Sequence, residues 1–216
     1  MSFVVSPMSE LETAEIPDRV PVMVLGGATL FPHGYMPLFL FEQRYREMLS
    51  YALERERMFC IGHALPDIET DEHPDPVHRI TTVGLIRACV THDDGTSHLM
   101  LSGLQRVEIL GWEQTAPFRV ATIVPQPSQI DDLTAVGNLA LEVVDLCGRL
   151  CGEGKLMTSQ LRDHLKGIHD PAAISDVVAQ SFISDSSQRQ RILEMLNVED
   201  RLSFLSTHLG QLLVDS

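Results

Sequence analysis

Short apolar runs separated by turn-forming residues dominate the chain from about residue 20 to residue 125. Such runs, rich in Val, Ile, Phe and Thr and bounded by Gly, Pro and Asp, are typical of β-strands. The pattern predicts strands over residues 20–25, 35–41, 58–64, 78–92, 97–103, 105–114 and 118–125. The stretch "DDGT" between two of these runs favours a hairpin. Six or seven short strands with one helix indicate a small, closed or nearly closed sheet.

One amphipathic helix interrupts the strands. Within residues 42–56, Tyr45, Met48, Leu49 and Ala52 recur at the i, i+3, i+4, i+7 spacing of a single apolar stripe. We therefore expect Tyr45 to face the sheet. The negative charge of Glu42, at the start of this helix, interacts favourably with the helix dipole. Arg44 is expected to be exposed or paired.

The second half of the chain is helical in pattern. A segment rich in proline and polar residues, 124–132, is the predicted linker. After it, apolar positions step by three and four, which predicts helices over residues 131–150, 159–165, 170–183, 186–196 and 199–213. Asp170 followed by Pro171 is a helix-start signal, and Asp185 or Ser186 is expected to cap the next helix. The fold class is thus α+β, with a β-subdomain at 18–124 and a helical bundle at 131–215.

Composition narrows the class of partner. The chain has 216 residues, 44% of them hydrophobic, which is ample for a core. Its net charge of −14 disfavours binding to nucleic acid and to anionic membranes. The four cysteines are not spaced as a disulfide framework, and neither a signal peptide nor a membrane helix is evident. We expect a cytoplasmic protein.

Motifs for chemistry are mostly missing. "CGEGKL" (151–156) lacks the first glycine of a phosphate-binding loop and has Leu156 where a hydroxyl is needed. "HPDPVH" (73–78), "THDDGTSH" (91–98) and the Cys147–Cys151 pair each fall short of three or four metal ligands. The acidic stretch 65–76 is predicted to be an exposed loop. We therefore predict no catalytic residue, no metal site and no cofactor, and a protein that is not an enzyme.

Three stretches, in the correct order, resemble the N-terminal domain of Lon proteases. They are "VPVMVLGGATLFPHGYMPLFLFEQRY" (20–45), "TTVGLIRACVTHDDGTSHLMLSGLQRVEIL" (81–110) and "DPAAISDVVAQSFISDSSQRQRILEMLNVEDRLSFL" (170–205). The first is similar to that domain's "lFP" turn and "PL-x-[IF]-FE-x-RY" segment, the second to its "DG" turn and "G-x-x-R" stretch, and the third to its closing "QxLLExxDVxxRL" helices. The resemblance spans about residues 18–214. It implies a PUA-like β-pseudobarrel followed by a helical bundle.

The resemblance also implies a function. In Lon, this region recognises substrate polypeptides, and an ATPase module and a serine–lysine protease domain follow it. The chain thus looks like a stand-alone substrate-binding domain. Two features depart from the family pattern, namely the glycines at 26 and 27 and the acidic stretch 65–76, so the family's substrate preference does not carry over directly.

The leading hypothesis is a non-catalytic module that binds proteins or exposed, unfolded polypeptide segments. Met36, Phe39 and Phe41 are the candidate binding residues. In an alternating strand they come from more than one face, and a strand in which all three are core residues remains an alternative. Phe39 and Phe41 share one side; which side is covered is left open by the sequence.

Three other functions stay open at this point. One is a pocket for a small molecule or peptide in the β-half, around Trp112 or His63. The second is an accessory subunit to a separate protease, and the third is an enzyme of unrecognised type. The sequence does not indicate an oligomeric state.

Overall fold

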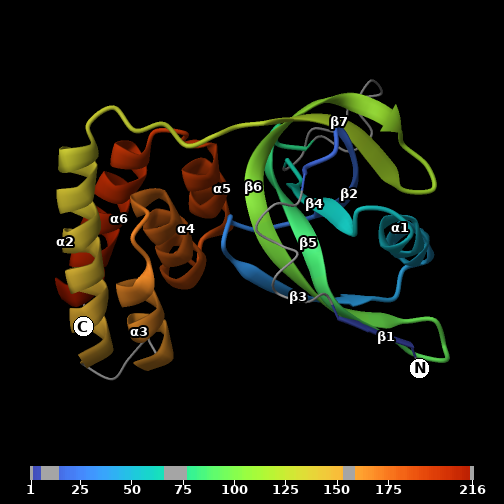
Figure 1. Cartoon of the computed structure of the whole chain (residues 1–216), viewed down its shortest axis with the longest axis horizontal. Coiled ribbons are helices and arrows are strands. Elements are labelled where there is room, and N and C mark those ends of the chain that lie inside the picture. The colour runs from blue at the N-terminus through green and yellow to red at the C-terminus, as the bar shows by residue number, and fades with distance from the viewer. Residues whose placement is uncertain (1, 6–14, 66–76, 153–158, 215–216) are drawn as a thin grey trace. The chain divides into compact units, whose positions relative to one another are not determined.

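The computed structural model describes residues 2–5, 15–65, 77–152 and 159–214. Residues 66–76, which make up most of the acidic stretch, lie outside the described residues. So do residues 153–158, which include most of "CGEGKL" (151–156). The chain divides into two compact units, Met1–Gln126 and Pro127–Ser216 (Figure 1). The first is built on a β-sheet with one helix, and the second is helical.

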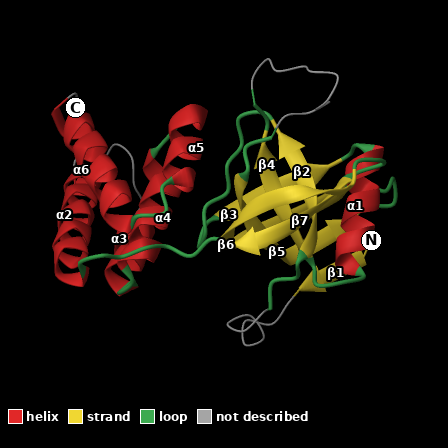
Figure 2. Ribbon diagram, turned by 90° about the horizontal axis from the view of Figure 1, so that it is seen from above, coloured by secondary structure: helices red, strands yellow, loops and turns green. Residues whose placement is uncertain are grey.

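The first unit contains a sheet that closes on itself. Its strands in the described residues are β1 (Ser2–Val5), β2 (Arg19–Leu25), β3 (Tyr35–Leu40), β4 (Met58–His63), β5 (Ile80–Thr91), β6 (Ser97–Gln114) and β7 (Arg119–Pro125). Hydrogen bonding runs β5-β4-β2-β7-β6 and returns from β6 to β5, which forms a five-stranded ring (Figure 2). β2 and β4 are parallel, and the other pairs are antiparallel. β1 and β3 extend the sheet outside this ring, from β5 and β6 respectively.

Apolar side chains from all five ring strands form one buried cluster, which includes Val22, Cys60, Val83, Val107 and Ala121. A second cluster joins the strands to the helix. The closed sheet expected from the strand pattern is confirmed, because β6 pairs with both β7 and β5 and so completes the ring.

One strand prediction was wrong. The runs 97–103 and 105–114 form the single long strand β6 rather than two strands. The chain stays extended through Gly103 and Leu104 because β6 pairs along its length with β3, β5 and β7 in turn. Its register with β5 shifts beside Gly84, and such irregularities let a long strand bend around a ring. β1 was not anticipated; four residues carry too little pattern to indicate a strand.

The predicted helix is α1 (Gln43–Leu53), which ends earlier than expected. Its buried residues are Tyr45, Met48, Leu49 and Ala52, so the predicted apolar stripe is confirmed. The Tyr45 hydroxyl donates a hydrogen bond to the carbonyl oxygen of Val24 in β2, at 2.8 Å. Arg44 pairs with Glu42, with 2.9 Å between Nε and Oε2. Helix α1 is therefore attached to the sheet through Tyr45, while Arg44 remains at the surface.

The second unit is a set of packed helices. They are α2 (Leu133–Gly152), α3 (Ser159–Gly167), α4 (Pro171–Phe182), α5 (Ser186–Glu194) and α6 (Val198–Val214). Asp170 caps α4 by accepting a hydrogen bond from the Ala172 N–H, and Asp185 caps α5 in the same way from Gln188. Asn197 caps α6, because its Oδ1 accepts a hydrogen bond from the Glu199 N–H. None of the helices in the described part of the chain is long and apolar enough to cross a membrane.

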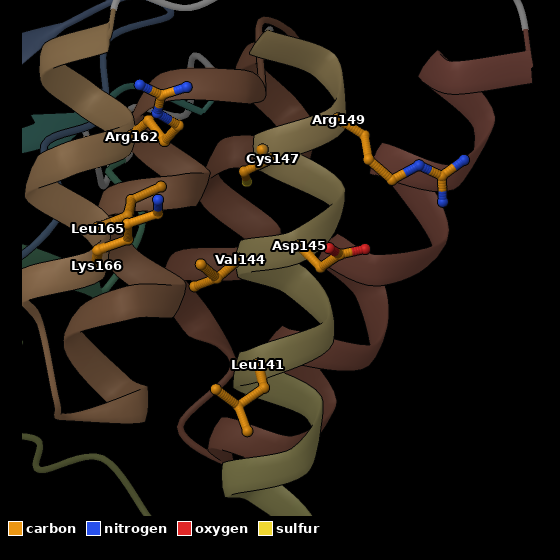
Figure 3. A pocket seen from close by; sticks show the side chains of 9 residues that line it. Leu141, Val144, Asp145, Cys147, Arg149, Arg162, Leu165 and Lys166 are labelled. Atoms are coloured by element: carbon orange, nitrogen blue, oxygen red, sulfur yellow. The ribbon is translucent and has the colours of Figure 1, made fainter. Parts of the chain in front are cut away.

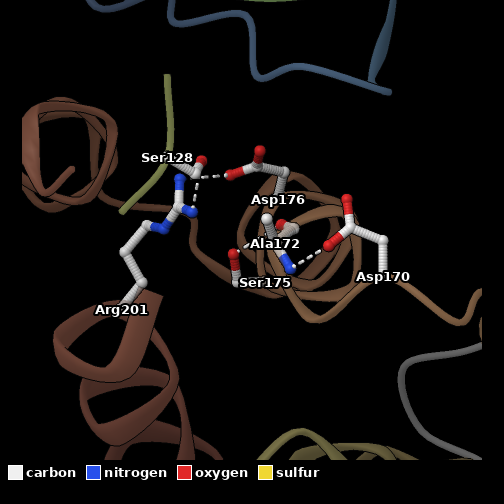
Figure 4. A network of polar contacts seen from close by, with 6 residues as sticks. All are labelled: Ser128, Asp170, Ala172, Ser175, Asp176 and Arg201. Atoms are coloured by element: carbon white, nitrogen blue, oxygen red, sulfur yellow. Dashed lines mark hydrogen bonds and ion pairs between the residues drawn. The ribbon is translucent and has the colours of Figure 1, made fainter. Parts of the chain in front are cut away.

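A buried ion pair joins α6, α4 and the segment before α2 (Figure 4). Arg201 is fully buried, and its Nη1 lies 3.2 Å from Oδ1 of Asp176. Its Nη2 donates to the Ser128 hydroxyl at 2.8 Å. Two buried charges are tolerated where each is paired and hydrogen-bonded. The pair therefore fixes the relative positions of these three segments.

Candidate functional site

Strand β3 divides its side chains between a buried and an exposed face. On the inner side, Leu40 is buried, and Met36 and Leu38 are partly buried against the core. The outer side is aromatic, with exposed fractions of 58%, 49% and 62% for Tyr35, Phe39 and Phe41. Phe41 directly follows the strand. Because successive residues of a strand point to opposite faces, the aliphatic residues anchor β3 and the aromatic residues are left in solvent.

A histidine from the neighbouring strand extends this surface. His98 of β6 is directly opposite Phe39, and the two rings lie 4.6 Å apart. Phe39 and Phe41 have ring centroids 5.9 Å apart. His98 Nδ1 is 2.9 Å from Nε2 of His92, at the far side of the hairpin. We call Tyr35, Phe39, Phe41 and His98 the aromatic face.

The hairpin beside the aromatic face is fixed by its own turn. Asp94 accepts hydrogen bonds from the N–H and the hydroxyl of Thr96. These bonds, chiefly the one from the backbone N–H, lower the pKa of the Asp94 carboxyl below its usual value. Gly95 adopts a positive φ of 81°, which glycine tolerates at no steric cost. The Asp-Gly turn predicted from the sequence is thus the turn between β5 and β6.

The position of β3 depends on a close approach between two backbones. The turn before β3 bonds to Gly103 of β6: the His33 N–H donates to the Gly103 carbonyl at 2.9 Å, and the Gly103 N–H donates to the Gly34 carbonyl at 2.8 Å. A Cβ at residue 103 would collide with the backbone oxygen of Phe31. Two sequence motifs, the "LFPHG" turn and the glycine of "GLQR", are therefore the two sides of one contact.

Of the three candidate residues, the structure brings Phe39 and Phe41 together on the aromatic face and places Met36 on the opposite side of β3. Tyr35 and His98 were not singled out from the sequence. The alternation of strand residues places Tyr35 on the same side of β3 as Phe39, so the sequence pattern also indicates Tyr35. His98 joins these residues only through the pairing of β3 with β6.

The alternative pocket residues lie in well-packed surroundings. His63 is buried, and its Nδ1 is 3.1 Å from the Thr29 hydroxyl. Its ring meets that of His78 edge-on at 5.3 Å. Trp112 is partly buried against the apolar cluster formed by the five ring strands. The Arg119 guanidinium lies 5.0 Å from the centroid of its ring. Both side chains therefore have a packing role.

Metal-binding and nucleophilic chemistry find little support among the described side chains, where no three His, Cys, Asp or Glu residues gather as metal ligands do. Cys60, Cys89 and Cys147 are buried thiols outside any disulfide. Burial raises the pKa of Cys60 strongly and that of Cys89 as well. A thiol with a raised pKa carries little thiolate at neutral pH and is a poor nucleophile.

Comparison with known proteins identifies the class. The family model for the substrate-binding domain of ATP-dependent protease La (LON) matches residues 19–211. The chain belongs to this LON substrate-binding domain family, and the likeness is to the substrate-binding domain rather than to a catalytic domain.

Individual relatives agree. The chain is 22% identical over 198 residues to a Lon protease of Dictyoglomus thermophilum, covering 92% of the chain and 25% of the relative. It is 29% identical over 204 residues to a Lon protease of Phenylobacterium zucineum, covering 91% and 25%. The chain thus spans about a quarter of the length of the curated relatives it matches.

Solved structures show the same fold. The N-terminal domain of the Mycobacterium avium complex Lon protease superposes with a TM-score of 0.73 at 17% identity, covering 89% of this chain and 98% of that one. A Lon N-terminal domain protein from Xanthomonas campestris gives a TM-score of 0.61 at 18% identity, covering 87% and 96%. The expected α+β fold of the Lon N-terminal type is confirmed.

Proposed function

We propose that the protein is a non-catalytic recognition module and that its aromatic face binds exposed, extended polypeptide segments. The observation that carries this proposal is the exposure of Tyr35, Phe39 and Phe41 together on one strand whose other face is anchored in the core. Exposed aromatic side chains are enriched at binding hot spots, because they bury a large area with few rotatable bonds.

The position of β3 in the sheet supports an extended ligand. In the described part of the chain, β3 hydrogen bonds to β6 alone and forms one end of the strand order. An edge strand presents backbone N–H and C=O groups with which an added strand can pair, and in β3 only Pro37 lacks the N–H. Backbone pairing supplies affinity without regard to sequence, and the aromatic side chains select apolar residues at alternate positions.

The overall charge favours some segments over others. With a net charge of −14, the protein repels strongly acidic segments and attracts basic ones. The expected ligand is therefore an unfolded segment with apolar or aromatic residues at alternate positions and few acidic residues. Family membership in a substrate-binding class supports the recognition role itself.

Fluorescence anisotropy with labelled, unfolded casein tests the proposal. Phe39→Asp should weaken binding at least about tenfold, because loss of an aromatic anchor costs more than about 1.4 kcal/mol. Leu110→Asp is the matched control, since Leu110 is 56% exposed on β6 but lies outside the aromatic face. Both variants should keep the wild-type melting temperature, and ATP should leave the affinity unchanged.

Absence of binding by the folded wild-type protein would refute the proposal. So would equal losses for Phe39→Asp and Leu110→Asp, because the effect would then come from added charge rather than from the aromatic face. A peptide with N-methyl groups at alternate residues lacks the backbone donors that would bond to β3, so it should bind more weakly than the unmethylated peptide. The difference in affinity measures the contribution of the edge pairing.

A further inference from the structure

A groove of about 380 Å³ lies between α2 and α3 in the helical unit (Figure 3). Its apolar lining is Leu141, Val144, Cys147 and Leu165, with the backbone of Gly148 beside them. The volume lies within the range of about 300–1,000 Å³ that is usual for small-molecule sites. From Leu141 to Gly148 the groove follows α2 for about 10 Å, at 1.5 Å per helical residue.

Positive charge lies on the α3 side of this apolar lining. Arg162 and Lys166 line the groove from α3, and Arg149 and Asp145 project from the other side of α2 (Figure 3). Beside the groove on α3, the two cations and the carboxylate of Asp163, which pairs with Arg162, leave a small excess of positive charge, although the chain as a whole is strongly acidic. Arg162 has an ion pair with the adjacent Asp163, with Nε and Oδ1 3.6 Å apart and both side chains well exposed. An exposed pair of this kind contributes about 0–1 kcal/mol and is easily exchanged for another anion.

Space for a ligand is left at Gly148. A Cβ added there meets nothing within 4 Å, so the position is open rather than occupied by a neighbouring side chain. Glycine in a helix interior costs about 1 kcal/mol relative to alanine. A larger side chain at residue 148 can therefore be placed without a clash.

We propose that this groove binds a small aliphatic carboxylate. The hydrocarbon chain lies along Leu141 and Val144, and the carboxylate is bound by Arg162 and Lys166, which are one helical turn apart on α3. The apolar lining and the cationic rim together match a ligand that is apolar at one end and anionic at the other. This site is independent of the aromatic face.

Isothermal titration calorimetry of the full chain tests the proposal with sodium octanoate as the probe and octan-1-ol as its uncharged counterpart. Octanoate should bind and octanol should bind at least tenfold more weakly. Gly148→Leu should abolish octanoate binding by filling the groove. Gly137→Leu is the matched control: Gly137 is in the same helix, a Cβ there also meets nothing within 4 Å, and it lies outside the groove.

The charged rim gives a second readout that does not depend on filling the groove. The double variant Arg162→Gln/Lys166→Gln should lower octanoate affinity at least about tenfold, which corresponds to about 1.4 kcal/mol. Circular dichroism should show unchanged helix content in all three variants. The proposal is overturned if octanoate does not bind, if octanol binds equally well, or if Gly148→Leu binds octanoate as the wild type does. Binding of a peptide with a free C-terminal leucine, in the absence of octanoate binding, would also overturn it.

Discussion

Replacing Arg201 with methionine should destabilise the helical unit by about 3–5 kcal/mol. Arg201 is fully buried and Asp176 is 97% buried, with 3.2 Å between Nη1 and Oδ1. The variant leaves the Asp176 carboxylate in the core without its cation, and breaking a buried pair from one side costs about 3–5 kcal/mol. Loss of the 2.8 Å hydrogen bond to Ser128 adds to this.

Urea unfolding followed by far-ultraviolet circular dichroism measures the effect. The double variant Arg201→Met/Asp176→Leu should recover most of the lost stability, since an apolar pair of similar volume is often as stable as a buried ion pair. Arg162→Met is the control: its pair with Asp163 is exposed, so a change of about 0.5 kcal/mol or less is expected. A cost below about 1 kcal/mol for Arg201→Met, or a double variant no more stable than the single one, would refute the reasoning.

Further predictions concern single contacts, and urea unfolding checks the first three. Tyr45→Ala should cost about 3 kcal/mol, as for truncation of a large buried aromatic, whereas Tyr45→Phe should cost about 1 kcal/mol through the lost bond to Val24; an unchanged midpoint for Tyr45→Ala would contradict its burial. Asp170→Ala should cost about 1 kcal/mol by removing the α4 cap, and Asp170→Asn should restore most of it. Gly103→Ala should unfold or strongly destabilise the β-unit because the added Cβ collides with backbone, while Gly111→Ala, where a Cβ meets nothing, should not. Cys60 should react with iodoacetamide only on unfolding; because its folded pKa is raised, its contribution to stability is present below the ordinary thiol pKa of 9.0 and decreases as pH rises above it. Rapid labelling of the native protein at pH 8 would be inconsistent with that burial.

Much of the fold follows from local pattern. The stripe of Tyr45, Met48, Leu49 and Ala52 predicted α1, and Asp170 with Pro171 predicted the start of α4, because caps and amphipathic stripes are local properties. The continuity of β6 was not predictable in this way. Gly103 resembles a strand break in the sequence, and only the backbone of the turn before β3, which approaches it in space, explains why a glycine stands in the strand.

The candidate site was predictable in part. Alternation placed Phe39 and Phe41 on one side of β3, but periodicity alone does not say which side of an edge strand is covered. The core packing of Leu40 decides this. His98 and the groove beside Gly148 depend on strand pairing and helix packing between segments distant in sequence, so no local pattern indicates them.

The side chains on the two faces of β3 have different roles. Leu38 and Leu40 contribute to folding, whereas Phe39 and Phe41 contribute little to the core. Substitutions on the outer side of β3 should therefore stay far from the threshold at which the protein unfolds, so the binding proposed for the aromatic face can be varied separately from stability. Under the proposed function, each outward residue of β3 is a position at which a point mutation changes the ligand preference of this chain while the barrel beneath stays the same.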